Sequence, residues 1–177
     1  YNTWRFVAEI FNNGSSNFEF DIPDFPSKRW RTFNVTVTAV TANPTKGTTS
    51  IDQGRFLRTD NGTMKYRYEY RHGAGVGADG NGTYMYSLPG LSFIDSTQMT
   101  VDTNPIDSYC GSGRVSASTD VNNRKVEVYA RTISQLSLES GGSDGGLEQV
   151  GSARYAFGTA GIAHCFTAEI PIRGWSE

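Results

Sequence analysis

Residues 64–70 read Met-Lys-Tyr-Arg-Tyr-Glu-Tyr, so that a large apolar or aromatic side chain occupies every second position. Charged side chains fill the positions between them. This period of two places one face of a β-strand on a core and the other towards water or a partner. The same alternation recurs in residues 32–39, 125–130 and 166–170. Each of these segments is therefore predicted to be a β-strand with one buried face.

Turn-forming residues separate the predicted strands. Asp60-Asn61-Gly62 directly precedes the 64–70 run, and Asn and Gly tolerate the left-handed backbone of a tight hairpin. No window shows helical periodicity, and the nearest approach to a helix is a turn at residues 95–99. Shorter strands are expected at residues 4–11, 18–22, 54–58, 83–88, 113–118 and 152–157. About ten short strands at this spacing predict an all-β fold, either a β-sandwich or a jelly roll.

The length and composition fit one globular domain spanning residues 1–177. The net charge is −2, and the densest basic cluster, residues 28–31, is interpreted as a solvated turn or edge strand, so we expect no nucleic-acid partner. No apolar run approaches the ~20 residues that a membrane-spanning helix needs. The chain opens on Tyr1 without a methionine or a signal sequence, and we expect it to be a piece of a longer protein.

The chain has two cysteines, Cys110 and Cys165. Two isolated thiols lack the paired spacing of a zinc site. We expect both thiols to be free and buried, although a disulfide between them is also compatible with the sequence.

The residue pattern does not indicate an enzyme. The two histidines, His72 and His164, are not accompanied by a nucleophile elbow or a comparable signature. His164 lies two residues before the core-facing Phe166 and is predicted to be structural. The acidic residues form no recognisable motif, and residues 79–82 lack the ladder of oxygen ligands that a calcium loop needs. We therefore predict no catalytic residue, no metal site and no cofactor.

Two glycine-rich loops, residues 73–82 and 141–146, are the candidate contact surfaces. Long loops on a rigid β scaffold are frequent sites of recognition, although a plain flexible connection is the alternative. His72, at the start of the first loop, is expected to be exposed. The contact residues expected from these loops are His72, Val76, Asp79, Asn81 and Asp144.

From about residue 54 onwards, three segments carry a resemblance to a known group of proteins. They are RFLRTDNGTMKYRYEYRHG (residues 55–73), GTYMYSLPGLSFIDSTQM (residues 82–99) and VGSARYAFGTAGIAHCFTAEIPIRGWSE (residues 150–177). Together they resemble the C-terminal domain of bacteriophage tail-fibre and related tail-tip proteins. The closing Pro-Ile-x-Gly-Trp, residues 171–175, is the most specific of these signatures.

The resemblance implies a jelly-roll-like β-sandwich that assembles as a homotrimer at the distal end of a virion fibre, spike or needle. Its implied partners are an upstream shaft and a glycan or protein of the host cell surface, which the domain would recognise or penetrate. The closing strand is expected at a sheet edge that meets a neighbouring subunit, because proline cannot donate to a central ladder. The trimer-interface residues expected there are Pro171, Ile172 and Trp175.

Other functions and one question of organisation stay open. The domain could be a structural trimerisation or folding clamp, a glycan depolymerase, or a secreted lectin-like domain glycosylated at Asn34, Asn61 and Asn81. The resemblance leaves out residues 1–50. We expect them to complete the same sandwich, because residues 33–39 alternate too regularly to form an isolated strand.

Overall fold

The structure, a computed structural model, describes residues 5–8, 18–21, 29–59, 61–73, 75, 77–90, 92–101, 108–116, 124–141, 147–153 and 155–173. These residues form antiparallel β-strands and loops and no helix, so the all-β prediction is confirmed. None of this described part could therefore cross a bilayer as a helix. The strands are β1 (Arg5–Ala8), β2 (Phe18–Asp21), β3 (Arg31–Phe33), β4 (Val37–Ala39), β5 (Thr49–Arg58), β6 (Thr63–His72), β7 (Tyr84–Ser87), β8 (Phe93–Ile94), β9 (Tyr109–Ser116), β10 (Arg124–Thr132), β11 (Gln135–Gly141), β12 (Leu147–Gln149) and β13 (Ala163–Arg173).

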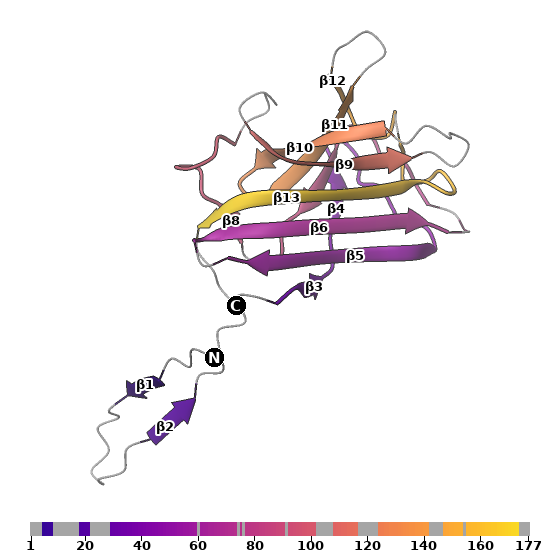
Figure 1. Cartoon of the computed structure of the whole chain (residues 1–177). Coiled ribbons are helices and arrows are strands. Elements are labelled where there is room, and N and C mark those ends of the chain that lie inside the picture. Colours follow the sequence, from indigo (N-terminus) through magenta and orange to yellow (C-terminus); the bar gives the residue numbers. More distant parts are fainter. Residues whose placement is uncertain are drawn as a thin grey trace.

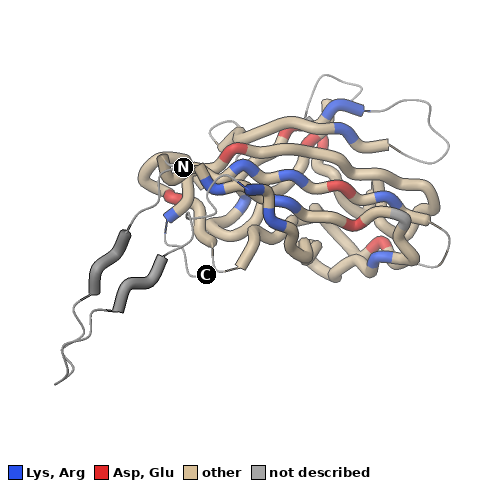
Figure 2. Tube along the Cα trace, turned by 60° about the horizontal axis from the view of Figure 1, so that its bottom comes forward, with Lys and Arg blue, Asp and Glu red and all other residues tan. Residues whose placement is uncertain are grey.

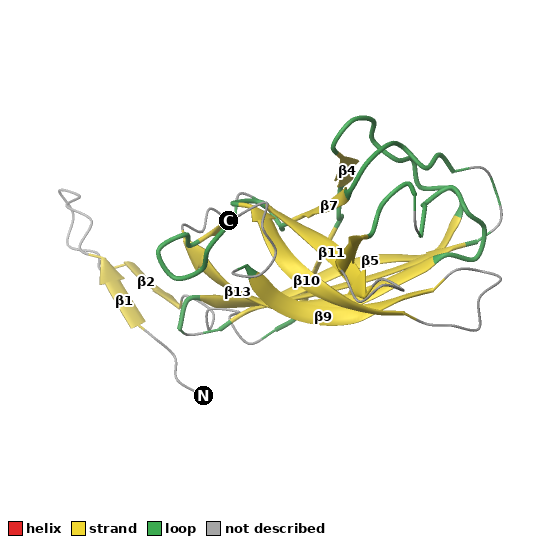
Figure 3. Cartoon of the chain, turned by 90° about the horizontal axis from the view of Figure 1, so that it is seen from above, coloured by secondary structure: helices red, strands yellow, loops and turns green. Residues whose placement is uncertain are grey.

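Most of these strands belong to one eleven-stranded antiparallel sheet. Its order is β3-β5-β6-β13-β9-β10-β11-β7-β4, with β12 paired to β11 and β8 paired to the end of β13. Figures 1 and 3 show that this sheet curls strongly. Strands β1 and β2 pair with each other in a separate two-stranded sheet, whereas β3 and β4 join the large one.

The chain bends sharply at residues 34–36, where a single strand over residues 32–39 was expected. That prediction is wrong, because β3 pairs with β5 at one end of the strand order and β4 pairs with β7 at the other. Residues 34–36 can span at most about 14 Å from Phe33 to Val37. This short connection therefore requires the sheet to curl until its two ends come close together.

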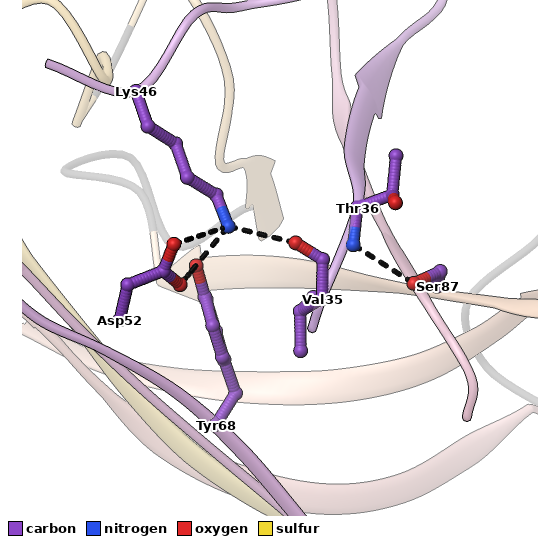
Figure 4. A network of polar contacts seen from close by, with 6 residues as sticks. All are labelled: Val35, Thr36, Lys46, Asp52, Tyr68 and Ser87. Carbon is purple, nitrogen blue, oxygen red and sulfur yellow. Dashed lines mark hydrogen bonds and ion pairs between the residues drawn. The ribbon is translucent and has the colours of Figure 1, made fainter. Parts of the chain in front are cut away.

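A polar cluster holds this bend in place (Figure 4). The Lys46 ammonium donates to the Val35 carbonyl at 2.7 Å and forms an ion pair with Asp52 at 2.8 Å. The Tyr68 hydroxyl donates to the same carboxylate at 3.0 Å. On the β7 side, the backbone N–H of Thr36 donates to the Ser87 hydroxyl at 2.9 Å. These bonds pair backbone groups that the sheet ladder leaves free at the bend.

The inner face of the curled sheet buries an aromatic core. Along β6 the burial alternates from Met64 to His72, as the period of two predicted. The Phe166 ring on β13 lies 5.0 Å from that of Tyr86 and 5.7 Å from that of Tyr66, measured between centroids. Aromatic pairs at this spacing stabilise a core beyond the area that they bury. The fully buried aromatic side chains are Tyr66, Tyr68, Tyr70, Tyr84, Tyr86, Phe157 and Phe166.

Both cysteines are free, which leaves the alternative of a disulfide without support. Cys110 is buried, and burial raises the pKa of its thiol to about 12. Cys165 is exposed, so the expectation that both thiols would be buried is wrong for this residue. The reason is the alternation of β13, which places His164 and Phe166 on the core and Cys165 on the outer face.

Candidate functional site

The antiparallel order separates the sheet into two ends with different contents. Strands β4, β6, β9 and β11 point the same way, because alternate strands of an antiparallel sheet are parallel to one another. The connections that follow them therefore leave from one end, which we call the loop end. Its described residues lie in three segments, residues 40–48, residues 73–83 without 74 and 76, and residues 150–162 without 154. The chain enters β3 and leaves β13 at the opposite end (Figure 1).

The described part of the first glycine-rich loop is fastened to its neighbours rather than loosely connected. The Asp79 carboxylate accepts a hydrogen bond from the backbone N–H of Gly158 at 2.8 Å. The backbone carbonyl of Asp79 accepts one from the Tyr84 hydroxyl at 2.6 Å. The same hydroxyl accepts the N–H of Phe157 at 3.1 Å. Tyr84 thereby ties residues 73–83 to the segment before β13, and the alternative of a plain flexible connection loses support for residues 77–83.

Backbone bridges fasten the other side of this loop to residues 41–48. Ala78 and Thr45 exchange two backbone hydrogen bonds of 3.0 Å each, and the Asn81 N–H donates to the Ala42 carbonyl at 2.7 Å. Gly80 has a φ of 65°, and a side chain there would meet the Ala42 carbonyl at 2.3 Å. Only glycine combines that conformation with so close an approach. The loop end is thus a defined surface built from three segments.

The predicted contact residues divide into exposed and buried ones. Asp79 and Asn81 are both exposed on the loop end. His72 is only 2% exposed, so the expectation of an exposed histidine is wrong. The alternation of β6 continues through its last residue and turns this ring inwards, where its Nε2 lies 3.3 Å from the Gly75 carbonyl. His72 can support the loop from the core side, and a contact role of the exposed Asp79 and Asn81 stays a prediction. Val76 and Asp144 lie outside the described residues.

His164 is held in the core by both of its ring nitrogens, as a structural histidine was predicted to be. Its Nε2 donates to the Tyr155 carbonyl at 2.9 Å, and its Nδ1 accepts the Tyr86 hydroxyl at 2.8 Å. The Nε2–H tautomer of the neutral ring satisfies both bonds at once. Burial lowers the pKa of His164 to about 4. Tyr155 adopts a φ of 59°, a left-handed conformation that non-glycine residues rarely take.

The closing strand does not lie at a sheet edge, contrary to the expectation. β13 pairs with β6 on one side and with β9 on the other, and it lies in the interior of the strand order. The pairing of β13 with β9 ends at Ala168, and beyond it the backbone N–H of Asp95 donates to the Pro171 carbonyl at 2.9 Å. Ile172 is buried and pairs with Ile94. Trp175 lies outside the described residues, and a role of these residues in a trimer stays a prediction.

Comparison with protein-family models, with curated proteins and with solved structures finds no match to this chain.

The sequence reasoning missed the contacts that organise the loop end. Within the described ranges no three His, Cys, Asp or Glu side chains gather as metal ligands. Hydrogen bonds instead bring together Asp79, Tyr84 and Gly158, which lie up to 79 positions apart in the sequence. The partial signal was the position of Tyr84 at the start of a strand with a buried face, since a buried phenol needs a hydrogen-bond partner. Nothing in the sequence indicated which partner that would be.

Proposed function

We propose that this chain is the tip domain of a phage tail fibre, spike or needle, which contacts the host cell surface as a homotrimer of jelly-roll-like units. The observation that carries the proposal is the polarity of the sheet. The chain enters and leaves the sheet at one end, and three fastened loop segments occupy the other. A domain attached to a shaft at the first end presents the second to its target. The resemblance of residues 55–73, 82–99 and 150–177 to tail-tip domains supports the same placement.

Exposed apolar side chains at the shaft end support the trimer. Phe93 is 41% exposed and Ile133 is 50% exposed, and the two are neighbours because the Ile94 N–H donates to the Ile133 carbonyl at 2.7 Å. Phe93 pairs with Arg173 at the end of β13. Burying such side chains against two further copies would stabilise the assembly, and trimerisation would repeat each host contact three times.

Replacing both Phe93 and Ile133 by serine is expected to weaken the trimer by about tenfold or more, because the buried apolar area at its interface is lost. Sedimentation velocity over a concentration series measures the change. Val40→Ser is the matched control, since Val40 is 63% exposed but belongs to the loop end. A wild-type protein that sediments as a monomer at micromolar concentration contradicts the trimer, as does an equal effect of Val40→Ser.

Host contact is tested by blocking the loop end without disturbing its backbone bridges. Asn81→Trp places a large side chain on this exposed position, and we expect it to weaken binding of the labelled protein to bacterial cells by about tenfold. Asn61→Trp is the control, because Asn61 is equally exposed but lies in the β5–β6 turn at the shaft end. Flow cytometry over a panel of strains gives the readout. Equal binding by both variants would instead favour a trimerisation clamp.

A further inference from the structure

The outer face of the sheet carries a cationic surface that is distinct from the three described loop segments. Figure 2 shows Lys and Arg residues on neighbouring strands of this sheet. Six cationic side chains of β5, β6, β9 and β10 and three carboxylates of β6, β10 and β13 share this outer face. The cations are Arg55, Lys65, Arg67, Arg71, Arg114 and Lys125. The carboxylates are Glu69, Glu127 and Glu169.

Two pairs of positively charged residues lie directly opposite each other on this face. Arg55 is the cross-strand partner of Arg67, and Arg114 is the partner of Lys125. Opposed side chains on neighbouring strands are about 5 Å apart at Cβ, and like charges in this position destabilise the sheet. The fold gains nothing from this arrangement, so a function of the surface is the better account of it.

The carboxylates compensate only part of this charge. Glu69 forms an ion pair with Arg67, and Glu169 lies opposite Lys65. Glu127 accepts the Tyr129 hydroxyl, and its cross-strand neighbour on β11 is Glu139.

Arg114 and Lys125 are both exposed. Among the described residues, neither Arg114 nor Lys125 has a carboxylate directly opposite it on a neighbouring strand, so the pair contributes positive charge to the face.

Small polar side chains fill the strip between the two cationic pairs. In register, Arg67 is followed by Thr167 on β13 and Ser112 on β9, and in the next row Cys165 lies opposite Arg114. Thr167, Ser112 and Cys165 are exposed. Two strand spacings separate β6 from β9, so the cationic pairs flank a strip about 10 Å wide. Nothing bulky projects from this strip, and its hydroxyl groups can donate and accept hydrogen bonds.

We propose that this strip binds an anionic polysaccharide of the host surface, with carboxylate or phosphate groups held by Arg114, Lys125 and the Arg55–Arg67 pair. The proposal rests on the proposed function and assigns a ligand class and a second contact surface to it. Sugar hydroxyls would meet Thr167 and Ser112. A single-stranded nucleic acid fits less well, because binders of that class present aromatic side chains for base stacking. The outward residues of β6 and β13 and of β9 from Ser112 to Ser116 are all non-aromatic, and the exposed Tyr109 lies outside the strip at the start of β9.

The binding test compares two double variants that each remove two positive charges. The probes are a galacturonate decasaccharide, a neutral dextran of the same length and a ten-nucleotide single-stranded DNA. We expect R114Q/K125Q to weaken galacturonate binding by about tenfold at low ionic strength, and R29Q/R173Q, whose arginines lie off the strip, to change it by less than about twofold. Equal losses in both variants would overturn the proposal. So would binding of dextran or of DNA with equal or higher affinity.

Cys165 provides an internal reporter in the centre of the strip. It is exposed, whereas Cys110 is buried, so a maleimide reagent modifies Cys165 selectively in the folded protein. Bound galacturonate is expected to slow this modification severalfold, and dextran is expected to leave its rate unchanged. Cys165→Ser identifies the labelled site. An unchanged rate at saturating galacturonate would contradict the assigned location.

Cell binding separates failure of this inference from failure of the proposed function. If the wild-type protein and R114Q/K125Q bind cells equally while Asn81→Trp does not, the cationic strip is irrelevant and the tip function stands. If the wild-type protein binds galacturonate through Arg114 and Lys125 but binds no strain of the panel, the result supports the anion-binding strip and contradicts the proposed tip function.

Discussion

Gly113→Ala is expected to lower the free energy of unfolding by about 3 kcal/mol, at the upper end of what overpacking usually costs. Gly113 lies on β9 opposite Phe166 in the middle of the sheet. A Cβ atom there would lie 2.3 Å from the Cys165 carbonyl and 2.4 Å from the Phe166 Cβ. Neither atom belongs to the end of a flexible side chain, so β9 and β13 must separate to admit the methyl group. Urea unfolding followed by circular dichroism measures the loss.

Gly141→Ala is the matched control for this substitution. Gly141 ends β11, and an added Cβ there meets nothing within 4 Å. We expect its free energy of unfolding to change by less than about 0.5 kcal/mol, as at ordinary surface positions. Equal stability of the two variants would show that β9 and β13 do not approach as closely as described. Gly111, whose Cβ would meet the Thr167 carbonyl at 2.0 Å, provides a second test of the same contact.

Acidification below pH 6.5 is expected to destabilise the protein through His164. Its pKa is lowered from 6.5 to about 4 in the folded state, because burial of the ring outweighs the opposing effect of its hydrogen bond to the Tyr155 carbonyl. In the unfolded chain the ring is protonated as the pH falls through its ordinary pKa of 6.5. In the folded chain it is protonated only near pH 4. The unfolded state therefore binds more protons in this window, and stability falls as the pH falls. The full shift is equivalent to about 3 kcal/mol.

His164→Gln separates this titration from that of the carboxylates. The glutamine amide is neutral at every pH and can donate to the Tyr155 carbonyl and accept the Tyr86 hydroxyl. Urea unfolding at pH 7 and at pH 4.5 should show the wild-type protein losing about 2 kcal/mol more than the variant. Parallel losses would mean that His164 is protonated in the folded protein at pH 4.5, which contradicts its buried, doubly hydrogen-bonded state.

Local pattern was sufficient for the strands whose two faces meet different surroundings. The alternation of residues 64–70 and of 166–170 predicted parts of β6 and β13 and their buried faces, and the predicted hairpin turn falls between the paired strands β5 and β6. Extending the period by one more pair of residues would also have placed His72 on the core. The strand expected at residues 152–157 does not form, and its described residues lie in turns and bends.

The candidate site was only partly accessible from sequence. Glycine content indicated that residues 73–82 form a loop, and Asp79 and Asn81 are exposed there as contact residues must be. The sequence did not indicate that residues 41–48 and 150–162 complete the same surface. Those neighbours are chosen by pairings such as Ala78 with Thr45 and Asp79 with Gly158. Such partners are set by the order of strands in the sheet, which a local period does not contain.

Sequence alone determined that this chain is a β protein and which side chains of its long strands face inwards. That information is local, because each strand needs only its own alternation to bury one face. Tertiary structure decided the rest: the interior position of β13, the bend at residues 34–36 and the union of three loops at one end. These features depend on which distant strands exchange hydrogen bonds and how closely they pack. One such contact is that of Gly113 with Phe166, where the missing side chain lets β9 approach β13 although the two residues are distant in the sequence.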